Sequence, residues 1–190
     1  MEFKKLSMLA LSTTYSIQIM TMQLELYQTQ YTNAVLGNEF IAAKKLLDQH
    51  PNINKNPIIT VDHLLHSMVF NENIEAIKFL VNTLTPEEIN KKDIYGRTAL
   101  HFAVKQNNLK IVKLLARKET VNEQDFTANT PLHVATIQES YNMEIIETLL
   151  KCMAKAKQNN QGKTPFDCAK TPEVRDLLAT YGHKKSCMIQ

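Results

Sequence analysis

The amino-acid sequence predicts an all-α solenoid of about five helix-turn-helix units with short β-turn tips. The first observation is a recurring phrase, which reads DIYGRTALHFA at 93–103, DFTANTPLHVA at 125–135 and NNQGKTPFDCA at 159–169. The second is a set of apolar runs with the same spacing, at 74–80, 109–115 and 143–150. Aligned apolar positions of the phrase lie 35, 32 and 34 residues apart, at Leu65, Leu100, Leu132 and Phe166. This period indicates repeats that bury their apolar faces by stacking on one another.

Capping and turn residues predict where each unit begins and ends. Thr98, Thr130 and Thr164 stand where a hydroxyl caps the first helix of a unit. Pro131 and Pro165 follow at the first helical position, where a missing N–H costs nothing. Gly96 and Gly162 fit turns that need a positive φ, and asparagines close three units, at Asn54, Asn90 and Asn122.

Residues 1–26 are expected to form an N-terminal capping segment. Apolar residues recur at helical spacing there, while Met20, Met22, Leu24 and Leu26 alternate as in a strand, and we favour the helix. The uncharged stretch 6–24 is too polar to span a bilayer and has no convincing cleavage site of a signal peptide.

The recurring phrase resembles the ankyrin repeat, whose unit of about 33 residues carries T-P-L-H-x-A. The resemblance covers residues 27–182, strongest in the third and fourth units. Ala128 replaces the turn glycine of the fourth unit, and we expect Gly182 to end the last helix. The expected units are 27–56, 57–90, 91–122, 123–157 and 158–182, followed by a flexible tail at 183–190.

The resemblance implies a non-catalytic protein that binds other proteins. It also implies that His66, His101 and His133 hydrogen-bond locally and to the adjoining turn, so we expect no metal site and no cofactor. Cys152 and Cys168 are expected to be small buried side chains, with a thiol-dependent enzyme using His133 as the weak alternative. No phosphate-binding loop or zinc motif is present in the sequence.

Partner-binding residues are predicted at the loop tips, at positions that the core of a repeat does not need. Exposed Tyr, Arg and Phe are residue types that anchor interfaces. The candidates are Tyr95, Arg97, Phe126 and Asn129 at the tips, and Gln106, Gln138 and Tyr141 beside them. For Phe126 the alternative is simple packing on the neighbouring tip.

Cys187-Met-Ile-Gln190 matches the C-a-a-X signal for prenylation, and the final glutamine favours farnesyl. Residues 151–190 hold eight Lys and Arg against three Asp and Glu, a net charge of +5. Lys184 and Lys185 flank the cysteine and suit an anionic membrane surface. A prenyltransferase and such a membrane are therefore expected partners, and the alternative is that the match is a coincidence.

We therefore expect a cytoplasmic, membrane-associated adaptor that binds protein partners and no nucleic acid. The architecture resembles ankyrin-repeat effectors that intracellular bacterial pathogens secrete into a host cell, some of which end in C-a-a-X. The alternative is a soluble ankyrin-repeat scaffold or inhibitor.

Overall fold

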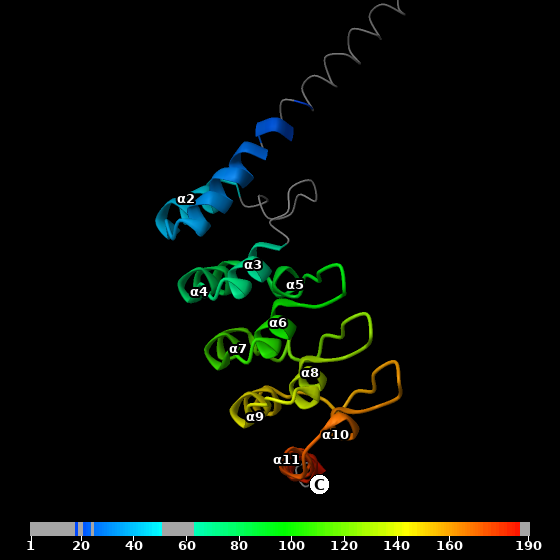
Figure 1. Ribbon diagram of the computed structural model, residues 1–190. Coiled ribbons are helices and arrows are strands. Elements are labelled where there is room, and N and C mark those ends of the chain that lie inside the picture. The colour runs from blue at the N-terminus through cyan, green and yellow to red at the C-terminus, as the bar shows by residue number, and fades with distance from the viewer. Residues whose placement is uncertain (1–17, 19–20, 24, 51–62, 187–190) are drawn as a thin grey trace, which may run out of the picture. The chain divides into compact units, whose positions relative to one another are not determined.

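The computed structural model describes residues 18, 21–23, 25–50 and 63–186 (Figure 1). The chain divides into two compact units, 1–64 and 65–190, which are taken in turn. Among the described residues, no helix combines the length and the apolar character needed to cross a bilayer.

The first unit contains a helical hairpin. A helix that includes residues 25–36 turns tightly into α2 (Phe40–Gln49). The turn is closed by the N–H of Glu39, which donates to the carbonyl of Ala34 at 2.7 Å, and Asn38 takes a φ of 59°. Asparagine tolerates this left-handed conformation better than most residues.

Aromatic and small side chains hold the two arms of the hairpin together. Tyr31, Val35 and Ala43 are fully buried, and the rings of Tyr27 and His50 stack with centroids 3.8 Å apart. The described part of the predicted capping segment (18, 21–23 and 25–26) is helical, which confirms helix over strand there. The rest of that segment lies outside the described residues.

The second unit is a stack of antiparallel helix pairs. Its helices are α3 (Leu64–Phe70), α4 (Ile74–Thr83), α5 (Pro86–Ile89), α6 (Ala99–Lys105), α7 (Leu109–Leu115), α8 (Pro131–Ile137), α9 (Met143–Lys151), α10 (Pro165–Cys168) and α11 (Pro172–Ser186). The pairs α3/α4, α6/α7 and α8/α9 lie in successive layers, and the loops before α6, α8 and α10 project on one side (Figure 1).

Helices α6, α8 and α10 each begin at a threonine, as predicted. The hydroxyls of Thr130 and Thr164 accept backbone N–H groups three residues on, and proline follows each at the first helical position. Thr98 is also part of a capping box, in which its own N–H donates to the Nδ1 atom of His101. These contacts satisfy N–H groups that a helix start leaves without partners.

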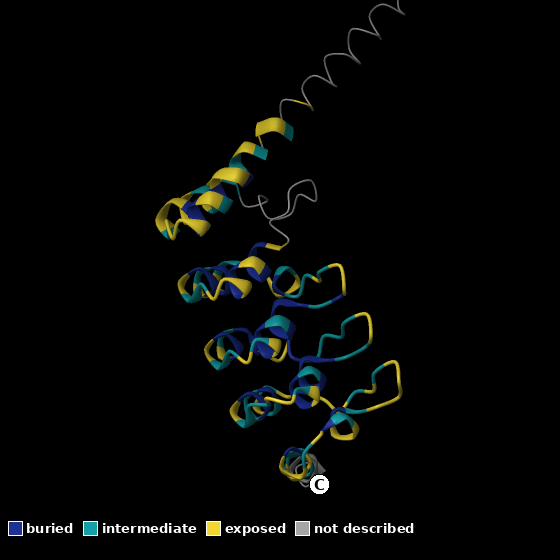
Figure 2. Cartoon of the chain, in the orientation of Figure 1, coloured by how far each residue is buried: buried dark blue, intermediate teal, exposed yellow. Residues whose placement is uncertain are grey.

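The second helix of each pair begins at an asparagine. The side chains of Asn73, Asn108 and Asn142 accept from backbone N–H groups in the first turn of α4, α7 and α9. These helices turn their apolar faces towards neighbouring layers, so the buried positions lie between layers and the exposed ones lie on the outer surfaces, the loop tips among them (Figure 2). The core is therefore a continuous strip, as expected for stacked repeats.

The last helix differs from the prediction that it ends at Gly182. Helix α11 continues through that glycine to Ser186, so the first four residues of the predicted tail are helical. A glycine inside a helix costs only about 1 kcal/mol relative to alanine and does not by itself end the helix. Residues 187–190 lie outside the described residues.

The three loop tips share one backbone geometry, which includes a left-handed residue. Gly96 and Gly162 have φ values of 76° and 71°, confirming the predicted turn glycines. Ala128 occupies the same position with a φ of 59°. The fourth unit therefore keeps the turn at the expense of a conformation that L-residues avoid.

Replacing Ala128 with glycine should raise the free energy of unfolding by roughly 0.5–1 kcal/mol. Relief of a left-handed residue is worth about 1–2 kcal/mol, and the greater freedom of glycine in the unfolded chain offsets part of this. Urea unfolding measures the change. Gly162→Ala is the matched reverse change, because nothing lies within 4 Å of the added Cβ, and should destabilise. A loss of stability in Ala128→Gly would contradict the strain argument.

Candidate functional site

A buried histidine joins each layer of the stack to the loop tip of the next. His101 is 1% exposed, its Nδ1 accepts the backbone N–H of Thr98 at 3.1 Å, and its Nε2 lies 3.1 Å from the carbonyl oxygen of Asn129. Because the carbonyl can only accept, Nε2 carries the proton and donates it. The ring is therefore neutral, with its proton on Nε2.

The same bridge recurs along the stack. His133 accepts the N–H of Thr130 at 3.1 Å and faces the carbonyl of Lys163 at 3.0 Å, and the Nε2 of His66 lies 2.9 Å from the carbonyl of Arg97. This confirms the expected local and inter-turn hydrogen bonds. Both ring nitrogens of His101 and of His133 are used in these bonds, so neither ring has a lone pair left for a metal.

Burial lowers the pKa of His101 and of His133 below the ordinary value of 6.5. Protonation would add a second N–H at Nδ1, directly opposite the N–H of the capping threonine. The folded state therefore binds these protons less readily than the unfolded chain, which links stability to pH.

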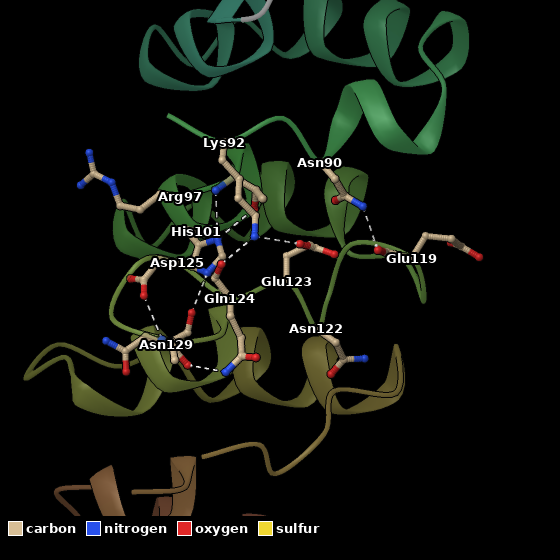
Figure 3. A network of polar contacts seen from close by, with 12 residues as sticks. Asn90, Lys92, Arg97, His101, Glu119, Asn122, Glu123, Gln124, Asp125 and Asn129 are labelled. Carbon is tan, nitrogen blue, oxygen red and sulfur yellow. Dashed lines mark hydrogen bonds and ion pairs between the residues drawn. The ribbon is translucent and has the colours of Figure 1, made fainter. Parts of the chain in front are cut away.

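A second set of contacts ties the long loops behind the tips to one another (Figure 3). The side-chain amide of Asn90 donates to the carbonyl of Glu119 at 2.9 Å, and Asn122 donates to the carbonyl of Met153 at 3.1 Å. Lys92 adds a bond to the carbonyl of Gln124 at 2.8 Å. Asn90 and Asn122, predicted to close units, therefore also connect those units to the next, whereas Asn54 lies outside the described residues.

The tips themselves form a ladder of backbone hydrogen bonds. The N–H of Phe126 donates to the carbonyl of Tyr95 at 3.1 Å, and the N–H of Asn160 donates to the carbonyl of Thr127 at 3.0 Å. The ring of Phe126 fills the space over Gly96, where an added Cβ would lie 2.5 Å from its Cδ1 atom. Glycine is thus needed at position 96 for close approach as well as for its φ.

Three large apolar side chains on these tips face solvent, and we call them the tip surface: Ile94, Tyr95 and Phe126. They are 78%, 59% and 69% exposed. The ring of Phe126 packs on the neighbouring tip and is still mostly exposed, and its part in partner binding stays a prediction. Adjacent exposed apolar residues on an ordered scaffold are typical of interaction sites.

Two of the predicted tip residues also have structural roles within the stack. Arg97 pairs with Asp93 at 2.7 Å, and its guanidinium lies over the rings of Tyr95 and Phe102, 4.6 and 4.3 Å from their centroids. The backbone N–H of Asn129 and its side chain are hydrogen-bonded within its own tip, and its Oδ1 accepts from the next tip. The charged side chain of Arg97 and the amide side chain of Asn129 therefore stabilise the turns in which they lie.

The predicted residues beside the tips form inter-repeat bonds. Gln106 donates to the carbonyl of Phe70 at 3.3 Å, and Gln138 donates to the carbonyl of Val104 at 3.0 Å. Each glutamine reaches back to the first helix of the preceding unit. Tyr141 is half-buried and directly precedes Asn142, the cap of α9.

A polar groove of about 530 Å³ lies next to the tip surface. It lies between the tips of the fourth and fifth units and the ends of α8 and α10, and the side chain of Asn160 joins it to the tip surface through a bond to the carbonyl of Phe126. The groove residues are Thr127, Asn129, Ile137, Asn159, Asn160, Gln161, Lys163, Asp167 and Cys168. Only Asn129 was a predicted binding residue, because amide side chains in turns give no distinct sequence signal.

The two described cysteines are half-buried, so the expectation of full burial is wrong. The thiol of Cys152 donates to the carbonyl of Ala116 at 3.2 Å. Burial raises the pKa of both Cys152 and Cys168. A raised pKa keeps a thiol protonated and poorly nucleophilic at neutral pH, which disfavours the thiol-enzyme alternative.

The predicted lipidation site is not in the described part of the chain. Cys187 lies outside it, and Lys184 and Lys185 belong to the last turn of α11.

Comparison with known proteins identifies the repeats. Residues 32–125 match the family model for ankyrin repeats in three copies. The match spans the first three predicted units, and the fourth unit has the same threonine cap and histidine bridge in the structure. The chain is therefore an ankyrin-repeat protein, with an all-α ankyrin fold.

Relatives share this repeat region over limited lengths. The ankyrin repeat protein FPV240 of fowlpox virus is 32% identical over 118 residues, which is 61% of this chain and 28% of the viral protein. The human transient receptor potential cation channel subfamily A member 1 is 33% identical over 88 residues, 46% of this chain and 8% of the channel. Dog inversin is 38% identical over 77 residues, 40% of this chain and 7% of inversin. The chain thus spans less than a third of each of these relatives, and ankyrin repeats of this kind indicate a protein-interaction scaffold.

Stability should fall as the pH is lowered from about 7 to about 5, because the lowered pKa values of His101 and His133 make the unfolded chain bind protons first. The stabilisation is complete above the ordinary histidine pKa and is lost as the pH drops through it. Urea unfolding at several pH values measures this slope.

Substituting both bridging histidines tests whether they cause this pH dependence of stability. His101→Gln and His133→Gln together should flatten the pH dependence, and each should cost about 1–3 kcal/mol at neutral pH through lost buried hydrogen bonds. His63→Gln, at an exposed position, is the control and should leave the slope in place. An unchanged slope in the double variant would rule out the bridges as its source.

Proposed function

We propose that this chain is a non-catalytic adaptor that binds a protein partner on its tip surface. The observation that carries the proposal is the exposure of Ile94, Tyr95 and Phe126 on two tips that are fixed by a backbone bond between them. Aromatic residues on rigid positions lose little conformational freedom when they are buried by a partner.

The neighbouring groove supports the same proposal. Its amide side chains, at Asn129, Asn159 and Asn160, are held in place by hydrogen bonds within and between the tips, so the groove presents a fixed polar surface close to the apolar tips. An apolar anchor beside hydrogen-bonding groups is the usual anatomy of a protein interface. The partner surface is therefore expected to place an apolar side chain on the tips and polar backbone groups over the groove.

Substituting the tip aromatics should weaken partner binding by roughly tenfold or more per residue, the usual cost of truncating a buried aromatic anchor. Tyr95→Ser and Phe126→Ser are the test variants, and titration calorimetry with a partner isolated by affinity capture is the measurement. Ile41→Ser removes a side chain that is 90% exposed in the first unit and serves as the control. Equal affinities for the wild type and the tip variants would place the binding site elsewhere.

We further propose that the adaptor is held on a cytosolic-face membrane by a farnesyl group on Cys187. The support is the match of Cys187-Met-Ile-Gln190 to the C-a-a-X signal, together with the net charge of +5 over residues 151–190. One lipid chain binds a membrane only marginally, and each basic residue near an anionic surface adds about 1 kcal/mol. A role as a bacterial effector in a host cell stays a prediction, since the relatives reported above come from a poxvirus and from mammals.

Expression in eukaryotic cells tests the anchor. The intact mass should show one added farnesyl group, and Cys187→Ser should abolish both this addition and recovery in the membrane fraction. Cys168→Ser is the control and should keep both. An unmodified, cytosolic wild type would favour the alternative of a soluble scaffold or inhibitor.

A further inference from the structure

The compact part of the chain at 65–190 contains an apolar pocket of about 280 Å³ that is separate from the tip surface and the polar groove. It lies among α8, α9, the loop after α9, α10 and α11. The lining residues are Leu132, Leu150, Ala154, Lys155, Ala156, Pro165, Phe166, Leu178 and Tyr181.

The pocket coincides with a change of residue type near the end of the fourth repeat. The position occupied by Lys155 is aligned with Ile89 and Val121 in the two preceding repeats. Those aliphatic side chains are 4% and 0% exposed, and they fill the space between layers. Lys155 is exposed, so the space left by the missing aliphatic side chain is not filled from this position.

The residues at the floor of the pocket are buried and apolar, whereas its rim is exposed and includes a cationic side chain. Leu132, Ala154 and Pro165 are buried and form the floor, while Leu150 and Leu178 are half-buried. Lys155 and Phe166 are exposed at the rim. The backbone N–H of Lys155 donates to the side-chain oxygen of Asn122 at 2.7 Å, and its ammonium group has no acidic partner among the described residues.

We propose that this pocket binds a monomeric fatty acid. The alkyl chain takes the place of the aliphatic side chain found in the preceding repeats, and the carboxylate pairs with the ammonium group of Lys155. Pockets for small molecules usually have volumes of about 300–1,000 Å³, so this one suits a single alkyl chain rather than a larger ligand. Burial of the chain on the apolar floor supplies the affinity, and the charge at the rim selects an anion over a neutral alcohol.

The test is a titration of the full chain with octanoate and, separately, with 1-octanol, followed by methyl NMR. Saturable shifts are expected at the methyl groups of Leu132, Leu150 and Leu178, with none at Leu80. Octanoate should bind roughly two- to five-fold more tightly than octanol, the effect of an exposed ion pair. Absence of saturable shifts at the pocket methyls would overturn the proposal.

Two substitutions of one residue separate the parts of the proposal. Lys155→Gln should weaken the binding of octanoate by the same factor and leave the binding of octanol unchanged. Lys155→Ile restores the residue type of the preceding repeats and should abolish the binding of both ligands. Lys163→Gln removes an exposed lysine of the polar groove and is the control. Retained octanoate binding in Lys155→Ile would show that the ligand lies elsewhere, and unchanged octanoate binding in Lys155→Gln would contradict the carboxylate pairing. Loss of tip-surface binding leaves these outcomes untouched, because the two sites share no residue.

Discussion

The hydrogen bond from a buried neutral histidine to the carbonyl of the next loop tip is the constraint on which the stack depends. His101 joins the cap of its own helix to Asn129, and His133 does the same for Lys163. Each ring therefore fixes a helix start and a neighbouring tip at once. Because the tips are held in this way, the backbone bond between Tyr95 and Phe126 can keep their apolar side chains in place on the surface.

The polar groups that hold the stack together are different from the residues proposed to bind a partner. Bridging histidines, loop asparagines and the Arg97–Asp93 pair use their polar groups within the stack, which leaves the tip surface as the accessible apolar feature beside them. A preformed surface of this kind needs little reordering when a partner binds. The fourth repeat departs from the two before it, because Lys155 replaces a buried aliphatic residue and an apolar pocket lies at that point.

The repeated phrase was sufficient to predict the helix pairs, the threonine caps and the turn glycines, because each depends on local residue types. The roles of Gln106 and Gln138 could not be predicted, since their partners lie in the preceding repeat. Those of Arg97 and Asn129 depend on how each tip folds back on itself, which the residue types alone do not show. The prediction that the last helix ends at Gly182 was wrong, because a glycine can lie inside a helix as well as at its end. The polar groove and the apolar pocket depend on which side chains meet across repeats, and spacing alone does not show this.

The central claim is that His101 and His133 are neutral rings with the proton on Nε2. Long-range proton–nitrogen NMR of the imidazole rings at neutral pH measures this directly. The structure predicts a protonated Nε2 and an unprotonated Nδ1 in both residues, a pattern that persists below the ordinary histidine pKa. An Nδ1-protonated ring, or an imidazolium at neutral pH, would contradict the bridge and with it the positioning of the tips.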